Sequence, residues 1–107
     1  MSPTAFDPVI HAPIRLQTCA ILASADKVEF ALLRDALEVS DSVLSKHLKQ
    51  LEEAGFVRLH KVPTAGRVKT WLSLTGHGRN SFAAHVRELQ RLASSSVIAP
   101  GAVTTAV

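Results

Sequence analysis

The chain has 107 residues, of which 47% are hydrophobic and 20% charged, a composition typical of one small globular domain. This length excludes a multidomain enzyme with a separate cofactor domain, and we expect a single domain over residues 7–93. The net charge of +3 is unevenly divided. The first 41 residues carry three basic and six acidic side chains, whereas the rest carry nine basic and three acidic ones. This asymmetry favours an anionic partner for the second half of the chain.

Signals for export, membrane insertion and disulfide bonding are missing from the sequence. The N-terminus has no positive run before an apolar stretch, and no run of eighteen apolar residues occurs anywhere. The single cysteine, Cys19, cannot form an intrachain disulfide, and no zinc-type cysteine spacing accompanies it. We therefore expect a cytoplasmic protein in a reducing compartment, with Cys19 as an inert thiol in the core.

The first third of the chain predicts two helices joined by a short strand. Pro8 and Pro13 suit helix starts, because proline lacks the N–H that a first turn leaves unpaired. The first long helix runs from about Pro13 to Ser24, and its wide apolar sector indicates two packing partners. Residues 27–30 alternate as a strand would, and residues 31–37 follow as a second, short helix.

A third helix is predicted from about Asp41 to Ala54. Ser40 is well suited to cap it, and Gly55 suits the left-handed residue that ends a helix. One face is an apolar stripe made of Leu44, Leu48, Leu51 and Ala54. The opposite face carries serine and lysine side chains, so this helix has one buried side and one polar side.

A hairpin and a final helix complete the predicted domain. The strands cover residues 56–62 and 68–74, joined by a turn at residues 63–66 that contains a proline and a glycine. Trp71 is expected to close the core beneath this hairpin. Thr75 caps the last helix, which runs to about Ala93, and residues 94–107 are expected to form a flexible C-terminal tail.

This order of elements is that of a winged helix-turn-helix domain. Residues 37–57, LEVSDSVLSKHLKQLEEAGFV, closely resemble the DNA-reading segment of the MarR and ArsR-type bacterial transcriptional regulators, and the similarity continues through the wing at residues 61–75. The resemblance covers about Pro13 to Leu92 and is closest to compact single-domain members. It implies a mainly α fold with a small β-hairpin wing, and a homodimer that binds a palindromic operator and usually represses transcription.

The physical chemistry of DNA recognition assigns contacts to these residues. A helix fits the major groove, where short polar side chains reach base edges and a valine methyl contacts thymine. Base-edge readers are predicted at Ser42, Val43, Ser45 and Lys46, and a phosphate contact at Lys49. On the wing, contacts with double-stranded DNA are predicted at Arg58, Lys61, Arg67 and Lys69, with Arg67 suited to a minor groove. His47 is a secondary candidate, and a packed, hydrogen-bonded histidine is an equally good interpretation.

Two residues depart from the pattern of these regulators. Glu38 occupies a turn position where glycine is usual, and a non-glycine residue at positive φ costs free energy, so the turn can be adjusted there. Asp41 lies in the first turn of the reading helix, where it suits the helix dipole but repels phosphate. It can face the amino group of a cytosine or remain in solvent.

The first and last helices carry more apolar surface than a core of this size needs. We therefore expect them to form a dimer interface that includes Ile14, Phe82, Val86 and Leu89. Two reading helices about 34 Å apart would meet successive major grooves, so the operator should be pseudo-palindromic.

Three other functions are alternatives to a DNA-binding repressor without an effector. A ligand- or metal-responsive ArsR-type sensor would use His77, His85 and Glu88, but their spacing fits such sites only partly, and no metal or other cofactor is predicted. An enzyme is not expected, because phosphate loops, nucleophile elbows and paired carboxylates are lacking. A winged helix used for protein interaction would need an apolar reading face, which this chain does not have.

Overall fold

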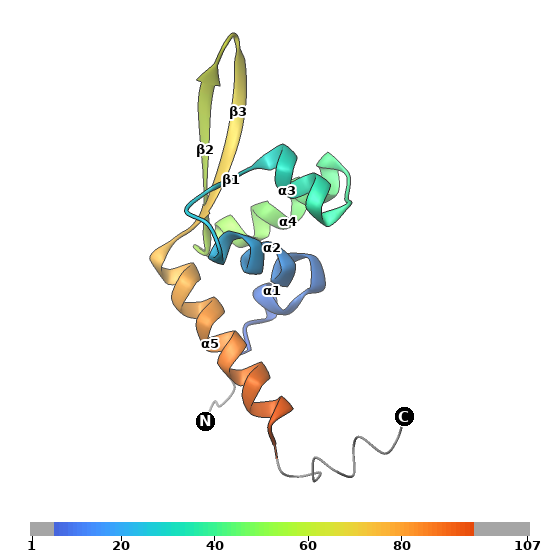
Figure 1. The fold of residues 1–107 in the computed structure, drawn as a ribbon, viewed down its shortest axis with the longest axis vertical. Coiled ribbons are helices and arrows are strands. Elements are labelled where there is room, and N and C mark those ends of the chain that lie inside the picture. Colours follow the sequence, from blue (N-terminus) through green and yellow to red (C-terminus); the bar gives the residue numbers. More distant parts are fainter. Residues whose placement is uncertain (1–5, 96–107) are drawn as a thin grey trace.

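The computed structural model describes residues 6–95 as five helices and a three-stranded antiparallel sheet (Figure 1). The elements are α1 (Pro8–His11), α2 (Pro13–Ala23), β1 (Val28–Glu29), α3 (Phe30–Leu37), α4 (Asp41–Glu53), β2 (Val57–Thr64), β3 (Arg67–Leu74) and α5 (Gly76–Ala93). The mainly α winged helix-turn-helix that the sequence predicts is confirmed. Residues 96–107 of the predicted tail lie outside the described residues.

Prolines begin both N-terminal helices, as predicted. Asp7 caps α1 by accepting a hydrogen bond from the Val9 amide at 2.8 Å, and Pro8 follows in the first turn. Pro13 begins α2, which ends before Ser24. Cys19 of α2 is fully buried, and burial, followed by the charge of Asp7, raises the pKa of its thiol to about 11. Cys19 is therefore protonated and inert at neutral pH.

The core lies where α2, α3, α4 and the base of the sheet meet. It is mainly aliphatic, and Leu22, Leu33 and Leu72 each contribute a fully buried side chain. The predicted apolar stripe of α4 is also buried, at Leu44, Leu48 and Leu51. Each buried leucine stabilises the fold by about 1.5–3 kcal/mol, so the orientation of α4 is well determined by packing.

The sheet has the order β1-β3-β2, which leaves β2 at an edge. Its hairpin differs from the prediction: the connection is the two-residue turn Ala65–Gly66, and the four-residue turn at residues 63–66 is wrong. Both turn residues have positive φ, 49° and 79°, which matches the twist of the flanking strands. Pro63 pairs with Val68 inside the ladder, because an edge strand tolerates a residue without an N–H.

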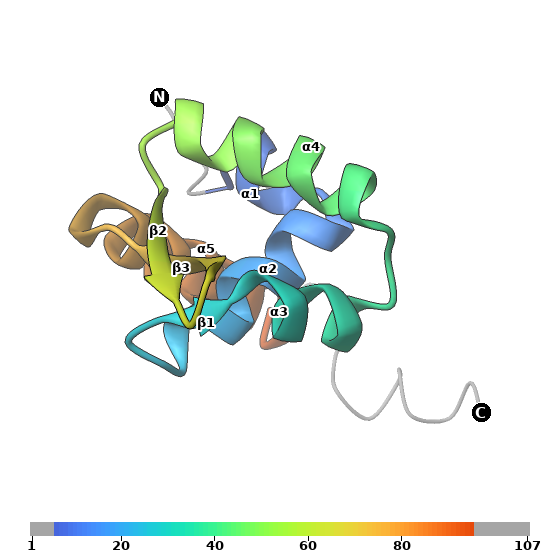
Figure 2. The ribbon, with the colours of Figure 1, turned by 90° about the horizontal axis from the view of Figure 1, so that it is seen from above.

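Trp71 lies on the outer face of the sheet, so its expected place in the core is wrong. Leu72 points into the core, and alternation along β3 turns Trp71 the other way. Trp71 is half-buried, and the ammonium group of Lys27 lies 5.0 Å from its ring centroid. In the view from above, α2 and α3 lie on one side of the sheet (Figure 2), opposite this outer face.

The wing, residues 57–74, and α5 point in opposite directions from the core (Figure 1). Thr75 joins them and caps α5 by accepting from the Gly78 amide at 2.9 Å. Gly78 is packed so closely that an added Cβ would lie 2.0 Å from the carbonyl oxygen of Phe56. Among residues 6–95, no helix has both the length and the hydropathy needed to cross a bilayer.

Candidate nucleic-acid interface

The polar face of α4 is exposed in the way that reading DNA requires. Ser40 caps the helix by accepting from the Val43 amide at 3.2 Å, so the first turn is fixed in position. The buried leucine stripe turns the opposite face to solvent. Every predicted contact on this helix is exposed, namely Ser42, Val43, Ser45, Lys46 and Lys49. The side chains at the N-terminal end are short or flexible, so α4 can approach base edges closely.

The turn between α3 and α4 keeps the left-handed residue that helix-turn-helix motifs use. Glu38 has φ 56° and ψ 46°, and its amide donates to the Asp35 carbonyl. The amide of Val39 donates to the Arg34 carbonyl, which completes the C-terminal cap of α3. The sequence therefore adopts the usual turn with glutamate in place of glycine, at a cost of about 1 kcal/mol.

Asp41, whose role the sequence left open, pairs with an arginine of α3. The Arg34 guanidinium donates to the Asp41 carboxylate at 2.9 Å and to Asp35 at 3.0 Å. The Asp41 hydrogen bond is the largest cause that raises the pKa of Arg34, followed by that of Asp35. This contact links the two helices of the motif and partly neutralises the carboxylate nearest the reading face.

A hollow of about 520 Å³ separates α4 from the wing. Lys49 lines it from the helix and Lys61 from β2, together with the hydroxyl groups of Ser45 and Thr70. The carboxylates of Asp41 and Glu52 also line it, as do Leu48 and Leu59. Two lysines and two hydroxyl groups facing one open space suit a sugar-phosphate strand that passes between the helix and the wing.

The predicted basic residues of the wing do not share one face. Lys61 pairs with Thr70 and lies on the side of the hairpin that faces α4. Side chains along a strand alternate between the two faces of a sheet. An odd number of positions separates Lys61 from Arg58, and its partner Thr70 from Arg67 and Lys69, so these three basic residues lie on the outer side with Trp71. Arg67 is next to the two-residue turn, at the outer end of the hairpin.

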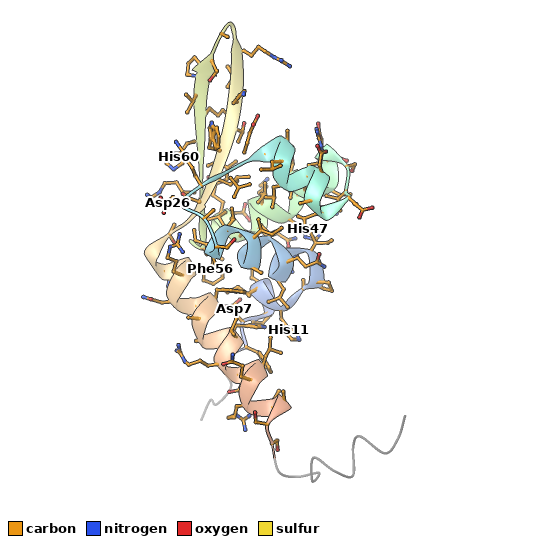
Figure 3. All side chains as sticks on the ribbon, viewed as in Figure 1. Asp7, His11, Asp26, His47, Phe56 and His60 are labelled. Atoms are coloured by element: carbon orange, nitrogen blue, oxygen red, sulfur yellow. The ribbon has the colours of Figure 1, made fainter. Side chains whose placement is uncertain are left out.

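His47 is half-buried on the side of α4 that faces α2 (Figure 3). Its Nδ1 accepts a hydrogen bond from the guanidinium of Arg15 at 3.0 Å, and Arg15 also donates to the side-chain oxygen of Gln50. Burial, then the charges of Arg15 and Lys46, lower the pKa of His47. The structure thus places His47 in a packed, hydrogen-bonded position, and a DNA contact by its exposed part stays a prediction.

Sequence reasoning missed a contact between the exposed His11 of α1 and a buried histidine of α5. His85 is fully buried, and its Nε2 lies 3.0 Å from Nδ1 of His11. The ring of Phe6 packs against both imidazoles, with centroids 5.0 and 4.8 Å away. Burial, then His11, lowers the pKa of His85, whereas Asp7 opposes this shift. Within the described part of the chain, Nδ1 of His85 has no hydrogen-bond partner.

The three residues weighed for a metal sensor have other contacts. His85 pairs with His11, the ring of His77 packs against Phe56 at 5.0 Å, and Glu88 pairs with Arg91. The Arg91 hydrogen bond is the largest cause that lowers the pKa of Glu88. Across residues 6–95, no group of three or more His, Cys, Asp or Glu side chains could hold a metal ion.

The residues predicted for a dimer interface lie on α2 and α5 and differ in how far their own chain covers them. Ile14 and Phe82 are half-buried and pack against the core of their own chain. Further along α5, Val86 is half-buried, whereas Leu89 is 36% and Leu92 48% exposed. The apolar seam of α5 therefore continues beyond the part of the helix that packs against the core of the same chain.

A helix-turn-helix with an exposed polar reading helix, followed by a basic hairpin, defines the class of winged-helix DNA-binding proteins. A family model described as a winged helix DNA-binding domain matches residues 14–93. The chain is 34% identical over 87 residues to the uncharacterized protein MJ0432 of Methanocaldococcus jannaschii, covering 81% of this chain and 95% of that protein. It is also 30% identical over 77 residues to the uncharacterized HTH-type transcriptional regulator YdgJ of Bacillus subtilis, covering 72% of this chain and 46% of YdgJ.

Among solved structures, the transcriptional regulator homologue protein from Pyrococcus horikoshii OT3 superposes with a TM-score of 0.78. The match has 23% identity and covers 84% of this chain and 89% of the other, and it shows the shared fold. The chain therefore belongs to the winged helix DNA-binding domain family.

Proposed function

We propose that this winged-helix protein is a transcriptional regulator that acts as a homodimeric, sequence-specific repressor and binds a pseudo-palindromic operator. The observation that carries this proposal is the position of α4, whose polar face is exposed beside a basic hairpin, with a lysine-lined hollow between them. An exposed helix with a basic wing fits a duplex, because the helix enters the major groove and the wing reaches the next backbone or groove.

In this proposal, the N-terminal half of α4 reads the bases. Ser42, Ser45 and Lys46 supply hydrogen bonds, with lysine preferring the acceptor atoms of guanine. Val43 is 41% exposed and offers a methyl surface to thymine. The cap at Ser40 supports this assignment, because it fixes the first turn from which these side chains extend.

The lysines and arginines supply most of the affinity. Lys49 and Lys61 would hold the phosphate strand that passes through the hollow, because both line it from opposite sides. Arg67 would enter a minor groove, and its position beside the two-residue turn supports this assignment. On the outer side of the wing, Arg58 and Lys69 would neutralise phosphates beyond the major-groove contact.

Dimerisation would double this surface and set the symmetry of the operator. The interface is proposed along α2 and α5, at Ile14, Phe82, Val86 and Leu89, and the exposed continuation of the α5 seam supports it. A dimer that occupies two successive major grooves excludes polymerase from an overlapping promoter, and repression requires no further surface.

Selection of bound fragments from the genomic DNA of the source organism tests this proposal. The recovered fragments should share two inverted half-sites, and a fragment placed before a reporter gene should lower its expression when the protein is present. Purified protein that shows no preference among fragments would contradict sequence-specific binding. A reporter whose expression rises would reject the repressor role and leave sequence-specific binding intact.

Two alanine variants separate base reading from phosphate binding. Lys46→Ala should weaken binding to the selected operator by about 1–3 kcal/mol and change binding to random duplex little. Arg67→Ala should weaken both and lower the slope of log affinity against log salt by about one. Equal losses on both duplexes for Lys46→Ala would remove this residue from the base-reading set.

A further inference from the structure

One arginine connects the reading helix to two other helices. Arg15 of α2 donates from Nη1 to Nδ1 of His47 at 3.0 Å, and to the side-chain oxygen of Gln50. Its Nε donates to the backbone carbonyl of Val9 in α1. Arg15 itself is half-buried, and its bonds to Val9 and His47 are partly shielded from water, whereas its bond to Gln50 is exposed. The guanidinium thereby joins α1, α2 and α4 at one point.

The two acceptors on α4 are three residues apart, which places them on one side of the helix. On this side His47 is half-buried against α2, whereas Gln50 is exposed. The planar guanidinium holds Nε and Nη1 in a fixed relative position, so bonding to Val9 through Nε and to both α4 acceptors through Nη1 restrains rotation of α4 about its own axis. Rotation of α4 would displace every side chain that reads a base edge.

We propose that Arg15 is a positioning residue for sequence reading: it sets the rotation of α4 against α1 and α2 without touching DNA. The inference rests on the proposed function. It also identifies a route to the expected dimer interface, because α1 carries both the Val9 carbonyl and His11, which contacts His85 of α5 at 3.0 Å. The reading helix and α5 are therefore joined through α1 by a continuous series of contacts.

Affinities for two duplexes test the proposal. Arg15→Lys keeps the charge and most of the stem but loses the planar fork, so binding to the selected operator should fall about tenfold. Binding to random duplex at low salt should stay within about twofold, since no phosphate contact is removed. The matched control is Arg79→Lys, which replaces an arginine that donates to the Ala23 and Ala25 carbonyls and not to α4. This control should keep the operator preference.

A second measurement detects the contact without DNA. Arg15→Met removes a positive charge and a donor from beside His47, so an NMR titration should show a higher pKa for this histidine, with Lys46 left as its charged neighbour. An unchanged His47 pKa, or an Arg15→Lys variant with the operator preference of wild type, would overturn the positioning role. Wild-type protein without any operator preference would contradict the proposed function, whereas the titration would still report on the Arg15 contact.

Discussion

The α4–wing half of the molecule and the half formed by α1, α2 and α5 use polar side chains in opposite ways. In the first half, the serines and lysines of α4 are exposed and aligned on one face. In the second half, His85 is buried against His11, and the half-buried Arg15 bonds to His47 across α2 and α4. An exposed basic face suits an external polyanion, whereas buried polar contacts fix how helices are placed. The α4–wing half would therefore contact DNA, and the other half would fix the orientation of α4.

The largest effect is expected from a charge on the exposed seam of α5. Leu89→Asp should give a monomer at concentrations where wild type is a dimer, because a carboxylate cannot be desolvated in an apolar interface. Operator affinity should fall about 100-fold or more, since the two half-sites are no longer bound together.

Sedimentation and DNA titration measure these two effects. Leu32→Asp is the control, because Leu32 is 64% exposed on α3 and lies outside the proposed interface. An unchanged dimer for Leu89→Asp would reject α5 as the interface.

The junction between the halves gives the next largest effect. Gly78→Ala should lower the free energy of unfolding by about 3 kcal/mol, because its Cβ would lie 2.0 Å from the Phe56 carbonyl oxygen. Gly76→Ala, two residues earlier in the same helix, has open space and should stabilise by about 0.5–1 kcal/mol. Denaturant unfolding of both variants measures the difference, and equal stabilities would contradict the close packing of α5 on the hairpin base.

Acid sensitivity should come from the buried half. The pKa of His85 is lowered in the folded state, mainly by burial, so the unfolded chain takes up this proton first as the pH falls. The free energy of unfolding should therefore decrease as the pH drops below 6.5, and His85→Leu should flatten this decrease. His47 contributes with the same sign, so adding His47→Gln should flatten it further.

Urea unfolding at pH 7 and pH 5 provides this comparison. At pH 7, His85→Leu should be neutral or slightly stabilising, because it removes a buried nitrogen without a partner in residues 6–95. A pH dependence equal to that of wild type would show that His85 titrates in the folded state as it does in the unfolded chain.

The smallest effect is expected at the turn of the reading half. Glu38→Gly should stabilise the protein by about 1 kcal/mol, because glycine adopts the left-handed φ of 56° without the steric cost. Ala36→Gly, on the exposed side of α3, should destabilise by about 1 kcal/mol instead. Thermal unfolding measures both, and destabilisation by Glu38→Gly would contradict strain at this turn.

The reading half could be predicted from the sequence because its signals are local. The cap at Ser40, the leucine stripe and Gly55 all lie within one helix and its ends, and the structure confirms each of them. At the turn of the wing, the prediction missed Ala65 as the left-handed partner of Gly66, because alanine rarely adopts positive φ. The two-residue turn extended both strands beyond their predicted ends.

The buried half could not be predicted in the same way. His11 and His85 are separated by 74 positions, so no periodicity brings them together. Arg15 and His47 are 32 positions apart, so their contact depends on how α2 and α4 are placed. Contacts of this kind follow from tertiary packing, which a local pattern does not contain.

Footprinting on a selected operator tests the central claim most directly: two copies present the α4–wing surface to one side of a duplex. The account predicts two protected half-sites about 10 base pairs apart, with flanking protection beneath each wing that disappears in a variant lacking Arg67 and Lys69. A single asymmetric protected site, or flanking protection unaffected by those two substitutions, would contradict it.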